Sequence, residues 1–311
     1  MKIKLFILPI FCLSTLFLNS CNDKLTTDTS KIVESSNIIK PTSTPIHKEG
    51  KLGNYHIYKL EDDTLTISNS DDINYRIDFA GMYMPWNDYK DYIKKVKFIG
   101  RVETLKNMFE DYKNLEIVES DGGLYNIQDF TFSGCSKLTS ITGIEHTYYI
   151  GNGAFKSCQS LSSFSFNKHI KEINEYTFYG CDSLTEINLD NSIKILHKYS
   201  FSNCKKLENV KLGQSIEKIE EYSFSNCDTL SELNLSNNCL LENNVFKDSE
   251  LFKDLYFNSL ESVDYFFNNL KDKCLYNIYI KKDIEYIPQG FEEVESIDSN
   301  YKCYNIIKEV K

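Results

Sequence analysis

The sequence lacks the motifs that usually mark a catalytic or metal-binding protein. No His-Glu-x-x-His, Gly-x-Ser-x-Gly or Walker-type segment occurs, and the five histidines are scattered along the chain. The pairs Asp62-Asp63 and Asp71-Asp72 lack the spacing of a calcium-binding loop. No Cys-x-x-Cys pair is present to suggest a zinc site. We therefore expect no catalytic activity, no cofactor and no metal.

An excess of positive charge is also missing. The chain has 35 Lys and Arg residues against 45 Asp and Glu residues, which gives a formal net charge of -10 at pH 7. This balance argues against nucleic acid as a partner and against broad attraction to anionic lipid. Beyond the N-terminus, no hydrophobic stretch approaches the length of a membrane span. Any membrane attachment is therefore expected at the N-terminus alone.

The first 20 residues have the pattern of an export signal. Lys2 and Lys4 precede the apolar stretch Leu5–Leu18, and Asn19-Ser20-Cys21 follows. This arrangement resembles a bacterial lipoprotein signal peptide at residues 1–20, in which a small residue precedes the cysteine that becomes acylated. We expect lipidation of Cys21 and a lipid-anchored protein of the bacterial envelope, at the outer membrane or the cell surface. An ordinary secretory signal is the alternative, although its usual Ala-x-Ala cleavage site is absent.

A 23-residue repeat occupies most of the remaining chain. Each unit reads Phe-x-x-Cys-x-x-Leu-x-x-Ile-x-Leu with apolar exchanges, and Tyr112 and Ser249 take the cysteine slot in an earlier and a later unit. The two leading slots hold Phe132, Phe155, Phe178, Phe201, Phe224 and Cys135, Cys158, Cys181, Cys204, Cys227. This period predicts an α/β-type repeat solenoid dominated by short parallel strands, a leucine-rich-repeat superhelix, over residues 101–280. Residues 281–311 are expected to form a C-terminal partial repeat or cap.

The Leu-x-x-Ile-x-Leu part of each unit is expected to form a short strand. Strands of successive coils would stack in parallel about 4.8 Å apart, and polar side chains between the apolar ones would share an outward, concave face. We regard this face as the candidate partner-binding face. Its members are Ser163, Ser165, Asn167, Glu186, Asn188, Asp190, Asn209, Lys211, Glu232, Asn234, Asp254 and Tyr256.

The phenylalanines and cysteines are interpreted as a structural ladder. A phenylalanine at every 23rd position fits a buried spine better than a ligand-binding row. Stacked cysteines could form disulfides in an exported protein, but their Cβ vectors would run parallel and five members cannot all pair. We therefore expect buried free thiols. Cys239, Cys274 and Cys303 lie outside the register, and a disulfide between two of them stays open.

A solenoid needs caps over its exposed ends, and residues 53–100 are expected to supply a β-rich N-terminal cap. Segments 55–60 and 64–68 alternate in polarity around an acidic turn, which predicts a hairpin. Further strands are expected near Ile77–Phe79 and at Val96–Ile99, with a helical turn at Asp91–Lys95. Residues 21–52 are rich in Ser, Thr, Asn, Asp and Lys, and are expected to be a flexible tether.

The repeat resembles the BspA-type, or treponemal-type, leucine-rich repeat of bacterial surface proteins. Ile170 to Leu189 reads Ile-x-x-Ile-x-x-x-x-Phe-x-x-Cys-x-x-Leu-x-x-Ile-x-Leu, and the likeness spans roughly residues 101 to 300. The usual proline after the strand is replaced by Asp190, Gly213 and Ser236. The resemblance implies an exported, lipid-anchored cell-surface protein, here expected to be monomeric. It would bind a protein or other macromolecule, in adhesion or host interaction, through its polar strand face.

Two other functions remain open at this point. A carbohydrate-binding surface protein would need exposed aromatic side chains, and the expected strand face offers only Tyr256. Tyr176, Tyr199 and Tyr222 repeat at the same 23-residue interval and could form such a row elsewhere, or a ladder on the convex side. A structural envelope protein without a soluble ligand is the other alternative. His169 and His197 are interpreted as solvated turn residues.

Overall fold

The computed structural model describes residues 46–53, 56–69, 84–236, 238–269, 277–286, 288 and 291–306. The chain divides into two compact units, Met1–Thr44 and Pro45–Lys311. The expected signal peptide, its lipidated Cys21, the strand near Ile77–Phe79 and Cys274 all lie outside the described residues. In the part of the chain that is described, no helix combines the length and apolar character needed to cross a membrane.

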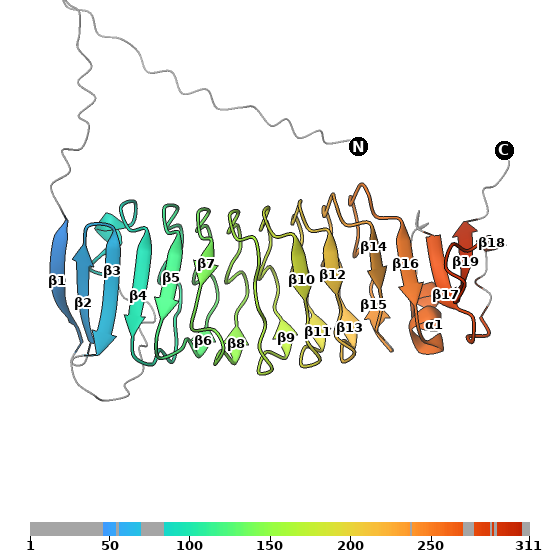
Figure 1. Cartoon of the computed structure of the whole chain (residues 1–311), viewed down its shortest axis with the longest axis horizontal. Coiled ribbons are helices and arrows are strands. Elements are labelled where there is room, and N and C mark those ends of the chain that lie inside the picture. Colours follow the sequence, from blue (N-terminus) through green and yellow to red (C-terminus); the bar gives the residue numbers. More distant parts are fainter. Residues whose placement is uncertain are drawn as a thin grey trace, which may run out of the picture. The chain divides into compact units, whose positions relative to one another are not determined.

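The N-terminal cap is a sheet that continues directly into the repeats (Figure 1). Its antiparallel strands are β1 (His47–Leu52), β2 (His56–Glu61) and β3 (Thr64–Asn69). Parallel strands then follow, namely β4 (Lys95–Ile99), β5 (Ile117–Ser120) and β7 (Ser140–Ile141). The predicted hairpin is thus present as β2 and β3.

Two details of the predicted cap are wrong. The sequence predicts a tether that reaches residue 52, but His47–Leu52 pairs with β2 along its whole length and extends the sheet of the cap. The helical turn expected at Asp91–Lys95 lies earlier, as a 3-10 turn at Asn87–Tyr89 (η1), and Lys95 already belongs to β4. Trp86 is fully buried beside this turn. Its ring packs edge to face with that of Tyr58, and the two ring centroids are 5.4 Å apart.

The coils of the repeat contribute strand segments to two different sides of the stack (Figure 1). The first series comprises β10 (Glu186–Asn188), β12 (Asn209–Lys211), β14 (Glu232–Asn234) and β16 (Asp254–Phe257). The second comprises β6 (Asn126–Ile127), β8 (Tyr149–Ile150), β9 (Glu172–Ile173), β11 (Ile195–Leu196), β13 (Lys218–Ile219) and β15 (Leu240–Leu241). Pairing is parallel, with Ile187 opposite Val210 and Ile173 opposite Leu196. The predicted leucine-rich-repeat solenoid is confirmed.

A column of phenylalanine rings forms the centre of the stack. From Phe109 to Phe246, consecutive rings lie nearly parallel with centroids 5.3 to 6.1 Å apart. The five ladder phenylalanines are 0% exposed. Burying such a side chain contributes on the order of 1.5 to 3 kcal/mol, so the column is a main source of cohesion between coils.

The ladder cysteines form a second buried column beside the phenylalanines. All five are free thiols, and each Sγ lies 3.1 to 3.3 Å from the carbonyl oxygen of the phenylalanine 26 residues earlier, to which it donates. Ser249 makes the same contact with the Phe224 carbonyl at 2.8 Å. Cys239 and Cys303 are also free and buried. Burial raises the pKa of Cys135 and Cys227 to about 12 and also raises the pKa of the three thiols between them well above the usual value for cysteine.

The C-terminal end departs from the repeat. Helix α1 (Leu260–Asn269) lies within residues 101–280, where the sequence predicts coils of the solenoid. Its Val263 and Phe266 pack into the core below β16. The sheet then continues through β17 (Asn277–Lys281) in parallel, and closes with the antiparallel strands β19 (Tyr301–Ile306) and β18 (Phe291–Val294). Antiparallel pairing thus ends the sheets at both ends of the stack.

Candidate binding face

We use "strand face" for the outward side chains of β10, β12, β14 and β16 together with those at the equivalent residues 163–167. The alternation predicted from sequence places apolar residues inside, as shown by the buried Ile187 and Leu233. Six predicted members are exposed on the first three strands: Glu186, Asn188, Asn209, Lys211, Glu232 and Asn234. Three adjacent coils therefore present a polar surface that no other described element covers.

The coil before β10 contributes less than predicted. Ser163 and Ser165 are exposed, but no strand forms there. Asn167 is a turn residue, because its Nδ2 donates to the carbonyls of Ile144 and Thr147 at 2.6 and 3.0 Å. Asp190 has the same structural role one coil later, where its Oδ1 accepts hydrogen bonds from the backbone N–H and the hydroxyl of Ser192. Assignment of Asn167 and Asp190 to the binding face is therefore corrected, since their polar atoms hold turns.

The last strand of the face carries a tyrosine cluster. Tyr256 stacks on Tyr279 of β17 with ring centroids 4.4 Å apart, and Tyr301 of β19 meets it edge-on at 5.3 Å. Burial raises the pKa of Tyr256 to about 12. Asp254 accepts a hydrogen bond from Asn277 Nδ2 at 2.7 Å. Tyr279 was missed, although the inward Ile278 and Ile280 on either side of it already indicate that it points outward.

Charged side chains on the strand face differ from those of the second series of strands. Among the described residues, Glu186, Lys211 and Glu232 take part in no ion pair. Beside β11 and β13, in contrast, carboxylates and cations of adjacent coils pair with one another. The pairs are Lys194–Glu217 at 2.6 Å, Lys198–Glu221 at 3.1 Å and Lys218–Glu242 at 2.6 Å. The charged side chains beside β11 and β13 therefore neutralise one another, while Glu186, Lys211 and Glu232 on the strand face keep charges available to a partner.

His197 belongs to this compensated side. Its Nε2 lies 2.9 Å from a Glu172 carboxylate oxygen and its Nδ1 3.3 Å from one of Glu220. The interpretation of His197 as a solvated turn residue is therefore wrong, since the ring is partly buried between two carboxylates. Within the described residues, no group of three or more His, Cys, Asp or Glu is arranged to hold a metal ion.

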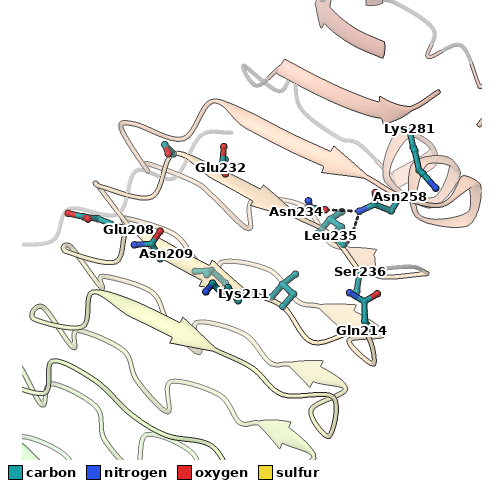
Figure 2. Close-up of a pocket in the computed structure, with 13 residues that line it drawn as sticks. Glu208, Asn209, Lys211, Gln214, Glu232, Asn234, Leu235, Ser236, Asn258 and Lys281 are labelled. Carbon is teal, nitrogen blue, oxygen red and sulfur yellow. Dashed lines mark hydrogen bonds between the residues drawn. The ribbon is translucent and has the colours of Figure 1, made fainter. Parts of the chain in front are cut away.

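Hollows interrupt the strand face among the described residues. A large one has a volume of about 660 Å³ and lies between β12 and β14 (Figure 2). Charged side chains surround it, namely Glu208, Lys211, Glu232 and Lys281. The smaller, of about 310 Å³, lies between β7 and the coil of Ser163, with Phe164 in its lining. The sequence gives no sign of either hollow, because both depend on the separation of neighbouring coils.

The predicted row of Tyr176, Tyr199 and Tyr222 exists away from the strand face. The rings stack with centroids 4.8 and 4.9 Å apart, within 6° of parallel. All three residues have positive φ angles of 57 to 63°, which a bulky residue rarely adopts. The faces of the rings cover one another, so the row is a ladder that holds turns together and offers mainly ring edges outward.

A different aromatic row is more open. The Arg101 guanidinium lies 4.0 Å from the ring centre of Tyr125, which stacks on Tyr148 at 6.0 Å. Tyr148 in turn contacts His169 with ring centroids 4.5 Å apart, and it is 54% exposed. This row lies at the turns of the first coils.

A family model matches most of the described solenoid. Six copies of the BspA type leucine rich repeat region match residues 102–194 and 171–305. No curated protein matches the chain.

Solved structures of bacterial leucine-rich-repeat proteins are similar to the chain. A leucine rich repeat protein of T. pallidum shares 20% sequence identity, with 68% of this chain and 89% of that chain covered and a TM-score of 0.44. A leucine rich cell surface protein of Faecalibacterium prausnitzii shares 14%, with 68% and 88% covered and a TM-score of 0.37. A leucine-rich repeat protein of Bacteroides ovatus shares 19%, with 68% and 71% covered and a TM-score of 0.38.

Proposed function

Because the chain belongs to the BspA type leucine-rich-repeat family, we propose that it is a cell-surface protein that binds a macromolecular partner through its strand face. The role is that of a non-catalytic scaffold in adhesion or host interaction. An extended, rigid surface of stacked coils suits a large partner better than a small molecule. The proposal also includes export and lipid attachment at Cys21. Incorporation of labelled palmitate into the parent chain but not into the Cys21→Ala variant would support this part.

The observation that carries the proposal is the difference in charge pairing between the two sides of the stack. Glu186, Lys211 and Glu232 are exposed and form no ion pair among the described residues. Lys194 and Lys218, on the second series of strands, are both paired with glutamates. Uncompensated charges on one face give a partner electrostatic orientation and faster association. We therefore expect an oppositely charged partner to gain the most electrostatic attraction at the strand face.

Charge reversal on the face tests the proposal. The doubly substituted chain Glu186→Lys, Glu232→Lys should bind immobilised host matrix proteins at least about tenfold more weakly, mostly through a slower association rate. The matched control is Glu110→Lys, Glu175→Lys, which makes the same change in charge at exposed turns outside the strand face. An equal loss of binding in both variants would mean that binding depends only on net charge. Unchanged binding of the Glu186→Lys, Glu232→Lys chain would show that the strand face does not bind the partner.

Carbohydrate binding is kept as a second candidate because of one observation. Tyr148 is exposed within the row formed by Arg101, Tyr125 and His169, and aromatic rings with a nearby cation are suited to sugars. A glycan array would show binding that Tyr148→Ala abolishes and the charge-reversed strand face leaves intact. No binding to any glycan on the array would leave the protein partner as the supported candidate.

A further inference from the structure

The larger hollow marks a break in the strand ladder. β10 pairs with β12, and β14 pairs with β16. Within the described ranges, no backbone hydrogen bond joins β12 to β14, although β13 and β15 of the same two coils are paired. The two coils therefore touch at the second series of strands and part at the strand face.

The break leaves backbone groups of both strands directed into the hollow. Leu189 N–H donates to the Lys211 carbonyl at 2.9 Å, and Leu235 N–H donates to the Tyr256 carbonyl at 3.0 Å. Peptide groups point alternately to the two sides of a strand. Val210 therefore directs its N–H and C=O away from β10 and toward the hollow, as Glu232 does from the opposite side. Strand edges with free donors and acceptors are templates for another strand.

Gly213 brings the turn after β12 close to the preceding coil. A Cβ atom at this position would lie 2.2 Å from the carbonyl oxygen of Asp190. The apolar floor beneath the hollow is more open than in the preceding coil. Val210 and Leu212 are only half-buried, whereas Ile187 and Leu189 one coil earlier are 2% exposed.

Charges are distributed unequally along the hollow. Glu208 precedes β12 and Glu232 is the first residue of β14, so two carboxylates stand where the strands begin. Lys211 is the last residue of β12 and Lys281 the last of β17, so two ammonium groups stand where strands end. Figure 2 shows the two glutamates toward one end and Lys281 toward the other. Lys281 also pairs with Asp283 at 3.1 Å, so the hollow is acidic at one end and Lys211 supplies the uncompensated positive charge toward the other.

We propose that this hollow receives an extended peptide segment of the partner, which runs between β12 and β14 as an added strand. The segment carries a basic group at the end near Glu208 and Glu232, and an acidic group at the end near Lys211 and Lys281. Backbone hydrogen bonds supply the affinity, and the two charged ends and the apolar floor set the specificity. The inference rests on the proposed binding function and names the kind of segment bound.

Short synthetic peptides test the inference on the whole chain. The probe is a fluorescent peptide of alternating threonine and valine with Lys at one end and Glu at the other, made in both orders and used where it stays monomeric. One order should bind saturably. Methylation of alternate backbone amides should weaken it at least about tenfold, because the ladder donors are lost. Lys211→Glu should weaken it comparably, whereas Glu175→Lys, at an exposed turn outside the strand face, should leave it unchanged.

Three results would overturn the added strand. The first is that neither peptide order binds. The second is that the methylated peptide binds as tightly as the unmethylated one. The third is that an oligosaccharide binds, that Lys211→Glu abolishes this binding, and that the peptides do not compete with it. If host matrix proteins still lose affinity on charge reversal at Glu186 and Glu232, the proposed function stands without this site. If instead the peptide binds and the charge-reversed variant binds matrix proteins as tightly as the parent chain, the proposed function is contradicted and the peptide site remains.

Discussion

At the scale of single residues, the cysteine slot of the central coils holds a small side chain that donates a hydrogen bond. Cys181 Sγ donates to the Phe155 carbonyl at 3.3 Å, and Ser249 makes the equivalent bond with its hydroxyl. The Phe155 carbonyl also accepts a hydrogen bond from the backbone N–H of Cys158 at 3.1 Å, so the thiol adds a second hydrogen bond at this oxygen. A reduced thiol can donate this bond and a disulfide sulfur cannot, which agrees with the five ladder cysteines being free.

These thiols predict a loss of stability at alkaline pH. Burial raises the pKa of Cys135 and Cys227 from 9.0 to about 12. Above pH 9 the unfolded chain therefore loses thiol protons that the folded chain keeps, and the free energy of unfolding falls. Each thiol contributes up to about 1.4 kcal/mol per pH unit. Urea unfolding in reducing buffer at about pH 8 and about pH 10 measures the slope.

Two substitutions in the same slot make this prediction specific. Cys181→Ser retains a donor and removes one ionisable thiol, so its loss of stability with pH should be gentler than in the parent. Ser249→Cys adds a thiol at the equivalent position and should make the loss steeper. Equal slopes in all three proteins would assign the alkaline sensitivity to other groups, such as the buried tyrosines.

At the scale of strands and turns, Gly213 allows the turn after β12 to approach the backbone of the preceding coil. Gly213→Ala would bring a Cβ atom into contact with the Asp190 backbone, so the turn must move. We expect a loss of about 1 to 3 kcal/mol in the free energy of unfolding, as for other overpacked sites. Gln214→Ala, an exposed neighbour in the same turn, should change stability by less than about 0.5 kcal/mol. Chemical denaturation of both variants tests the difference, and equal stability of Gly213→Ala and the parent would contradict the close approach.

The strands themselves could be predicted because a fixed period sets their register. Ile187 opposite Val210 follows directly from the 23-residue interval. β1 could not be predicted, because an edge strand rich in charge has the composition of a tether. The roles of Asn167 and Asp190 in turns, and the hollow beside β12, depend on contacts between coils that the repeat pattern does not describe.

At the scale of the whole molecule, each coil packs against its neighbours in sequence, so cohesion differs along the stack. In central coils, the ladder phenylalanine stacks on a phenylalanine of the coil on each side. The strand β19 instead pairs in antiparallel fashion with β17 and β18. Nearest-neighbour stabilisation of this kind lets terminal parts open before central ones.

Cysteine alkylation under native conditions should report this order. We expect Cys303, on β19, to react first and Cys181, in the middle of the stack, to react last. Both are buried, so reaction requires opening of the surrounding structure. Mass spectrometry of peptides after timed labelling gives the rates, and urea-unfolded protein serves as the control in which the rates should converge. Native labelling of Cys181 as fast as that of Cys303 would contradict independent opening of the end.

The outermost strands of the solenoid have a consequence for molecules crowded together at a surface. β1 exposes Lys48, Glu49 and Lys51, and β18 exposes Glu292 and Glu293. Charged side chains on an edge strand oppose pairing with the edge of another sheet. Copies of the protein should therefore not polymerise end to end into fibres, and each would engage its partner as a separate unit of fixed length.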